Sequence, residues 1–179
     1  MGGDLGRGAG HRGGLPGRLV RARGQIVGRA GQLRGGIGQR RGVLIDFSDQ
    51  LLDALQEPVE PAGDLAPFVA LPEAEIARRL AAAAASEDPL ADPLSHLRTI
   101  LATTDGVFAV GRWLLEDEPF DLIALYVEGT DTVGHRFAHY LPPRLPWVDE
   151  AGYDAYSATM AGYYEHCDRR LAEMMAAAP

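Results

Sequence analysis

The stretch Asp121-Leu-Ile-Ala-Leu-Tyr-Val-Glu-Gly-Thr-Asp131-Thr-Val-Gly-His135-Arg-Phe137 carries the strongest structural and chemical signal in this 179-residue chain. Its first part, residues 121–127, is an apolar run that predicts a buried β-strand with little room for a solvent-facing side. The part that follows predicts a helix opening within residues 131–140. Strand ends are where open α/β sheets present their ligands, so we expect a functional site directly after this strand.

Asp131 and His135 are four residues apart, which places both side chains on one face of a helix, about 5–6 Å apart at Cβ. A carboxylate and an imidazole are both zinc ligands, and Gly134 is expected to let the backbone approach closely beside His135. The plainer interpretation is that Asp131 caps the helix while His135 points into solvent or into the core. Because a catalytic zinc site normally takes three protein ligands, the pair alone would be half of a site.

Apolar spacing along the rest of the chain predicts mainly helices. We expect a short helix after Ser48, a second beginning at Pro72, a long one over residues 93–117 and a last one over 150–177. Residues 86–93 and 141–149 are expected to be loops. The last helix is expected to bury one stripe, formed by Tyr153, Tyr156, Met160, Tyr164, Cys167, Leu171 and Met174. The order helix, strand, helix favours an α/β fold, although a single strand is too few for a sheet.

The first 42 residues differ sharply in composition from the remainder. They hold 15 of the 22 glycines and nine arginines against one acid, so their net charge is +8, whereas residues 43–179 carry −16. No hydrophobic period survives in residues 1–42, and we expect disorder there, with a folded domain over 43–179. Three interpretations of this tail stay open: an RNA-binding segment of the Arg-Gly-Gly type, an ordinary flexible extension, or a translation artefact.

Composition also excludes several classes of protein. Without lysine the chain cannot contain a P-loop, and with Cys167 as its single cysteine it has no intrachain disulfide framework. We expect a soluble protein, because no apolar stretch reaches the roughly 18 residues of a membrane span and the arginine-rich N-terminus lacks the apolar core of a signal peptide. The acidic body disfavours nucleic acid as a main partner, except through the tail. The compartment stays open.

The stretch from Tyr126 to Pro143 resembles the metal-ligand motif of the alkaline phosphatase superfamily. It is most similar to the type I phosphodiesterase/nucleotide pyrophosphatase branch, in which a strand leads into an Asp-x-x-Gly-His-like motif, an aromatic residue and a proline-containing loop. Here the motif reads Asp131-Thr-Val-Gly134-His135, followed by Phe137. The helix containing Asp168-Arg-Arg-Leu171 resembles the one that follows in the family. The resemblance implies an αβα sandwich, of which this chain would be a fragment.

By this resemblance, Asp131 and His135 would bind one of two zinc ions in an enzyme that hydrolyses a phosphate ester or diester. The family attacks phosphorus with a metal-activated Thr or Ser, and two metals stabilise the attacking and leaving oxygens. The family's nucleophile motif, a further Asp ligand, an Asp-His pair and a last His find no match in the 179 residues. We therefore expect no efficient catalysis by this chain. The alternative is a non-catalytic helical binding module whose tail contacts RNA.

Other groups of polar residues are expected to be structural. His139 lies four residues after His135 but is expected to lie at the surface or to support a ligand without binding the metal itself. The consecutive residues Glu165, His166, Cys167 and Asp168 cannot form a triad, because neighbours on a helix diverge by about 100°. Glu116-Asp117-Glu118 is expected to be a solvated helix end before Pro119, and the tyrosines of the last helix are expected to pack in the core.

Overall fold

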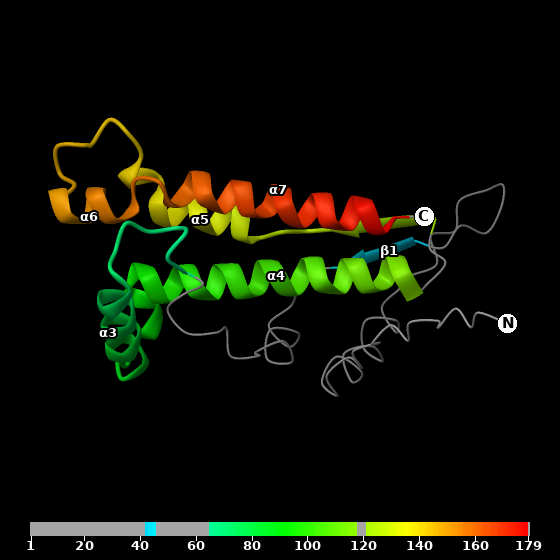
Figure 1. Cartoon of the computed structure of the whole chain (residues 1–179), viewed down its shortest axis with the longest axis horizontal. Coiled ribbons are helices and arrows are strands. Elements are labelled where there is room, and N and C mark those ends of the chain that lie inside the picture. Colours follow the sequence, from blue (N-terminus) through cyan, green and yellow to red (C-terminus); the bar gives the residue numbers. More distant parts are fainter. Residues whose placement is uncertain (1–41, 46–64, 118–120, 179) are drawn as a thin grey trace, which may run out of the picture.

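The computed structural model describes residues 42–45, 65–117 and 121–178, and its framework is a set of helices lying lengthwise (Figure 1). The long helices α4 (Pro93–Asp117) and α7 (Thr159–Ala177) run in the same direction and pack against each other. Helix α5 (Gly129–Phe137) lies against both of them, and α3 (Glu73–Ala84) crosses one end of α4. Apart from Gly42, the predicted tail lies outside the described residues, and so does the predicted helix after Ser48.

Helix α4 has the predicted bounds. Asp92 caps it, since its carboxylate accepts hydrogen bonds from the backbone N–H of Leu94 at 2.8 Å and of Ser95 at 3.3 Å. The same carboxylate binds Arg79 of α3 at 2.7 Å, so the cap also joins the two helices. The side chains that recur every three or four residues along one face of α4 are all buried: Leu94, Leu97, Leu101, Thr104 and Phe108.

Helix α3 begins as predicted, with Pro72 as its N-cap residue and Glu73 and Glu75 in the first turn, where the helix dipole favours negative charge. Ile76 and Leu80 face the core. The connection to α4 holds a short 3₁₀ helix, η2 (Pro89–Ala91), which Asp88 caps. The loop predicted over residues 86–93 is thus a tight turn rather than an open segment.

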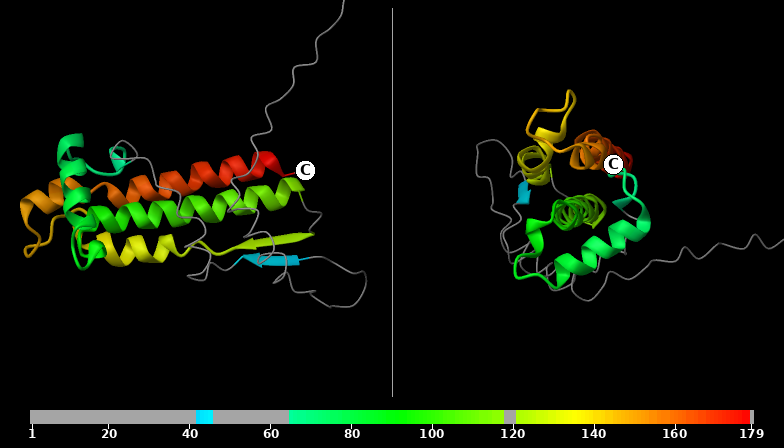
Figure 2. Two further views of the ribbon diagram at one scale, coloured as in Figure 1. Left: turned by 90° about the horizontal axis from the view of Figure 1, so that it is seen from below. Right: turned by 90° about the vertical axis from the view of Figure 1, so that its left-hand side faces the viewer.

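The predicted strand exists as β2 (Leu122–Leu125), but the expectation that it is buried is wrong. The side chains of β2 alternate between exposed and half-buried, and Leu122 is 58% exposed. β2 pairs in parallel with β1 (Gly42–Ile45), with Gly42 opposite Leu122 and Ile45 opposite Leu125, and these strands make a two-stranded sheet in the described part of the chain. Figure 2 shows this ribbon alongside α4. The apolar sequence of β2 predicted a strand covered on both faces. In the described residues, the main helix contact of β2 is with α4, so much of the strand is left exposed.

The predicted helix over 150–177 is two helices, α6 (Glu150–Tyr156) and α7, separated by Ser157 and Ala158. Its buried stripe also differs from the prediction, because Tyr163 is fully buried and Tyr164 is 45% exposed. Two hydrogen bonds from polar side chains of α7 determine which of its faces is buried. The Thr159 hydroxyl donates to the Phe68 carbonyl at 2.8 Å, and the hydroxyls of Tyr163 and Thr104 bond at 2.8 Å.

The core lies where α3, α4, α5, α6 and α7 meet, at the end of the molecule away from the sheet. The expectation of core tyrosines is correct for Tyr156 and wrong for Tyr164, while Tyr153 is only half-buried. Among the described residues, every helix is too short or too polar to span a bilayer. The αβα sandwich stays a prediction, since the described residues show mostly helix and a small parallel sheet.

Candidate metal-binding pair on helix α5

Helix α5 presents Asp131 and His135 to solvent because its opposite face is locked into the core. Gly129, Val133 and Phe137 recur at every fourth position and are all buried. At about 100° of rotation per residue, positions 131 and 135 then lie on the far side of the helix axis. The two side chains are 69% and 82% exposed, respectively.

Within the pair, His135 Nε2 lies 3.4 Å from Asp131 Oδ1. The two groups therefore face each other across one helical turn, as the spacing predicts. The capping interpretation of Asp131 finds no support in the described residues: α5 begins two residues earlier, and no side chain caps its N-terminus by a hydrogen bond. Asp131 in the first turn and His135 in the last both suit the helix dipole.

The spacing of the donors fits a shared metal ion. Two donors bound at about 2.1 Å to one tetrahedral zinc ion lie about 3.4 Å apart, which is the distance observed between Asp131 Oδ1 and His135 Nε2. A catalytic zinc site normally takes three protein ligands, and in residues 42–45, 65–117 and 121–178 no three His, Cys, Asp or Glu side chains gather closely enough to hold an ion.

Gly129, rather than Gly134, is the glycine that the helix packing requires. A Cβ atom at Gly129 would overlap the Tyr163 hydroxyl and lie 2.6 Å from Thr104 Oγ1. A Cβ atom at Gly134 would meet nothing within 4 Å, so no described part of the chain packs closely beside His135. Because Gly129 has no side chain, α5 can pack directly against the Thr104–Tyr163 hydrogen bond. This contact fixes the position of α5 and therefore of Asp131 and His135.

The two threonine hydroxyls beside the pair are not placed as nucleophiles. Thr130 donates to the Val127 carbonyl at 2.9 Å, and Thr132 donates to the Glu128 carbonyl at 3.3 Å. Both bonds close within the local turn, where they stabilise the start of α5. His139 lies in the 3₁₀ helix η3 (Ala138–Tyr140), exposed, with its ring 4.0 Å from that of Tyr140.

The residues Glu165 to Asp168 do not form a triad. His166 turns toward α4, where its Nε2 lies 2.7 Å from Asp105 Oδ1. Cys167 lies beside Tyr163, and burial raises the pKa of its thiol, which disfavours the reactive thiolate. Glu116 pairs with Arg112 at 2.9 Å, as a solvated helix end would, while the side chains of Asp117 and Glu118 lie outside the described residues.

Sequence reasoning missed a charged cluster between the two long helices. Asp105 of α4 accepts a hydrogen bond from Arg170 Nε at 2.7 Å and pairs with His166 at the same distance. Burial alone would raise the pKa of Asp105, but the bonds from His166 and Arg170 outweigh it and lower the pKa. The signal available in the sequence was the four-residue spacing of His166 and Arg170; their partner, 61 residues or more away, could not be inferred.

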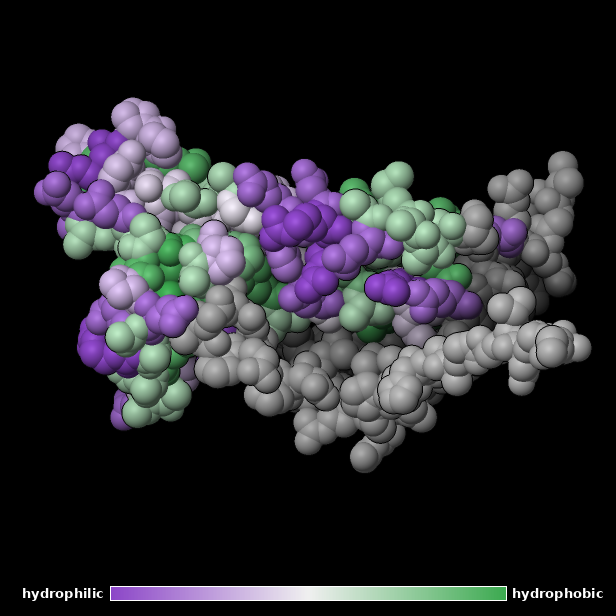
Figure 3. Space-filling view, in the orientation of Figure 1, coloured by the Kyte–Doolittle hydropathy of each residue, from purple (hydrophilic) through white to green (hydrophobic). Residues whose placement is uncertain are grey.

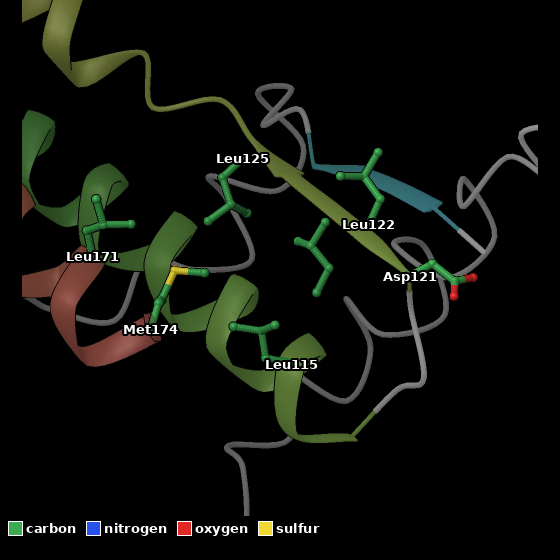
Figure 4. A pocket seen from close by; sticks show the side chains of 7 residues that line it. Leu115, Asp121, Leu122, Leu125, Leu171 and Met174 are labelled. Carbon is green, nitrogen blue, oxygen red and sulfur yellow. The ribbon is translucent and has the colours of Figure 1, made fainter. Parts of the chain in front are cut away.

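An apolar hollow of about 360 Å³ lies at the opposite end of the molecule from the core (Figure 4). It is formed by the ends of α4 and α7 and by β2, with Leu115, Leu125 and Met174 pointing into it while the Asp121 carboxylate points away. Figure 3 shows hydrophobic surface near the same end of α7, where Leu171 and Met175 are exposed. Its described lining residues are apolar except for Asp121.

Comparison with known families assigns the chain to a class of protein. The model of the type I phosphodiesterase/nucleotide pyrophosphatase family matches residues 53–179. The chain belongs to this family, which is consistent with the alkaline phosphatase superfamily and with hydrolase chemistry. No curated protein and no solved structure matches the chain.

Proposed function

We propose that Asp131 and His135 supply two ligands of one zinc ion in a phosphohydrolase of the phosphodiesterase/nucleotide pyrophosphatase type. The observation that carries this proposal is the 3.4 Å separation of Asp131 Oδ1 and His135 Nε2 on the solvent face of α5. It matches the spacing of two donors on one tetrahedral ion. The family assignment supplies the class of reaction.

The residues of α5 would hold the ion in a fixed position. Asp131 contributes negative charge that offsets the cation, and His135 contributes a neutral ring nitrogen. Zinc, when bound, stabilises negative charge on phosphoryl oxygens and activates an oxygen nucleophile. The buried Gly129, Val133 and Phe137 keep the helix from rotating, so the two donors need little reorganisation to bind.

The substrate class that follows is a phosphate ester or diester, and we propose that this chain does not turn it over alone. The described residues hold no third ligand beside the pair, and both neighbouring threonine hydroxyls donate to backbone carbonyls. Phosphoryl transfer relies on neutralising and positioning the phosphate, which two ligands and a single ion would do poorly.

Zinc titration by calorimetry tests the ligand assignment. The wild-type chain should bind zinc with roughly micromolar affinity, and Asp131→Ala and His135→Ala should each weaken binding about tenfold or more. His139→Ala is the matched control, an exposed histidine one turn further on, and should bind like wild type. Equal binding by all four proteins, or none by wild type, would contradict the proposal and leave Asp131 and His135 as an ordinary surface pair.

A hydrolysis assay tests the proposal that this chain does not hydrolyse phosphodiesters alone. With bis(p-nitrophenyl) phosphate and excess zinc, the 179-residue chain should release no p-nitrophenol above the zinc-only background. Turnover that disappears in His135→Ala would show that the chain holds a complete site after all.

A further inference from the structure

We propose that two copies of this chain complete one zinc site, each supplying Asp131 and His135, an inference that rests on the proposed function. One chain offers a carboxylate and an imidazole whose donor atoms lie 3.4 Å apart, and both side chains are mostly exposed. A structural zinc ion almost always takes four protein ligands in a tetrahedral arrangement. Two Asp-His pairs, one from each copy, supply these four ligands.

The described part of the same chain brings no further ligand to the pair. In residues 42–45, 65–117 and 121–178 no three His, Cys, Asp or Glu side chains gather closely enough to hold an ion. His139 follows His135 by four residues, but α5 ends at Phe137 and His139 belongs to η3, where its ring lies 4.0 Å from that of Tyr140. The remaining positions around an ion at the pair therefore face solvent, from which a second molecule can approach.

The geometry of the pair suits a two-fold symmetric arrangement. Two opposite edges of a tetrahedron share no corner, and a two-fold axis through its centre relates one edge to the other. The separation of Asp131 Oδ1 and His135 Nε2 matches the length of one such edge, about 3.4 Å for donors bound at about 2.1 Å. The same two atoms of a second copy would form the opposite edge, as a closed two-fold dimer requires.

The surface around the pair is open to a second copy. Helix α5 lies on the outside of the helix bundle (Figure 2). Glu128 and Ala138 lie three residues before and after the pair, on the same face of the helix, and both are exposed. Ala138 adds little bulk to this face, so the two helices could approach closely enough to share an ion.

Charge makes this contact depend on zinc. Glu128 and Asp131 place two negative charges on the exposed face of each copy, and the whole chain has a net charge of −8. Two copies therefore repel each other across this face when no cation is present. One zinc ion offsets the charges of the two Asp131 carboxylates, and the free energy of metal binding replaces the large apolar area that a metal-free dimer would need.

The shared site would differ in chemistry from a catalytic one. A zinc ion with four protein ligands keeps no open position, whereas a catalytic zinc ion does. The dimer would therefore hold the ion without presenting it to a phosphate ester. Zinc-driven pairing is thus compatible with the inactivity proposed above for this chain.

Stoichiometry and mass, measured together, test this inference. The full 179-residue chain is freed of metal with a chelator and titrated with zinc chloride by calorimetry, and sedimentation velocity gives its mass. We expect one zinc ion per two chains and a shift from monomer to dimer that excess chelator reverses. Asp131→Ala and His135→Ala should stay monomeric at zinc concentrations that pair the wild type, whereas the control His139→Ala should pair like wild type.

Ala138→Arg tests the contact without removing a ligand. The long charged side chain would lie between the two helices, so zinc-driven dimerisation should weaken about tenfold or more. The variant should still bind zinc, with one ion per chain in place of one per two chains. Its circular dichroism spectrum, compared with that of wild type, shows whether it is folded.

The outcomes separate this inference from the function on which it rests. If zinc binds through Asp131 and His135 with one ion per chain and the wild type stays a monomer, the shared site is wrong and the proposed function stands. Zinc-driven dimers that persist in both Asp131→Ala and His135→Ala would also overturn the shared site. If the wild type binds no zinc, the proposed function fails and the inference fails with it.

Discussion

Gly129 shows how one residue fixes the candidate site. Its backbone lies against the Thr104–Tyr163 hydrogen bond, which joins α4 to α7 inside the core. The contact leaves no space for a side chain, and it places the first turn of α5. Two residues later, Asp131 is carried to the opposite face of the helix. The packing of Gly129 therefore fixes the position of Asp131.

Gly129→Ala should destabilise the protein by about 1–3 kcal/mol, because the added methyl group overpacks a site with buried polar atoms. The measurement is the free energy of unfolding from urea denaturation followed by circular dichroism. Gly134→Ala is the matched control in the same helix. It has open space around its Cβ position and should be neutral or stabilising by about 0.5–1 kcal/mol. Equal effects of the two substitutions would show that the packing at Gly129 does not matter.

At the scale of elements, α4 and α7 are joined by polar contacts as well as by apolar packing. The Thr104–Tyr163 bond lies in the core, and the cluster of Asp105, His166 and Arg170 lies nearer the surface on the same pair of helices. The His166 side chain is 12% exposed and lies edge-on to the Phe68 ring, with ring centroids 5.7 Å apart. These contacts fix which face of α7 is buried, and the apolar spacing in the sequence had predicted that face wrongly.

The Asp105 cluster predicts a loss of stability in acid. The folded pKa of Asp105 lies below its ordinary value, so the ionised carboxylate stabilises the fold above the unfolded pKa, and this contribution is lost as pH falls through the folded pKa. Stability should therefore decline from about pH 4 downward. In Asp105→Asn that decline should be smaller, measured as the difference in unfolding free energy between neutral and acidic buffer.

The control for this experiment is Asp168→Asn, which removes an exposed carboxylate from α7. Its acid-induced loss of stability should equal that of wild type. If the unfolding free energy of Asp105→Asn falls in acid as much as that of wild type, His166 and Arg170 do not stabilise the Asp105 carboxylate in solution.

At the scale of the whole molecule, packing is uneven between the two ends. The core cluster lies around α3, α5 and α6. At the other end the second half of α4 is buried, with Val107, Val110 and Leu114 almost inaccessible, but the hollow beside β2 and the exposed Leu122 also lie there. A two-stranded sheet has few contacts to hold it. The sheet end should therefore open more readily than the helical core.

Hydrogen exchange measures this difference directly. Backbone amides of α4 between Leu97 and Leu114 should be the slowest to exchange, and those of β2 should exchange orders of magnitude faster through local opening. Gly111 of α4 lies close to the Leu125 side chain of β2, since a Cβ atom at Gly111 would lie 2.7 Å from Leu125 Cδ1. Amides of β2 that exchange as slowly as those of α4 would refute the uneven packing.

The sequence by itself determined the elements whose cause is local. Proline at the start of α3, the apolar spacing and Asp92 cap of α4, and the four-residue spacing of Asp131 and His135 all act within a few turns of chain. The family match over residues 53–179 agrees with the resemblance carried by that Asp-x-x-Gly-His motif. Tertiary structure alone decided which glycine is packed, which tyrosine is buried, where the last helix breaks and how exposed β2 is. These features depend on partners far along the chain, such as Thr104 with Tyr163 and Phe68 with Thr159, and no local pattern records where those partners meet.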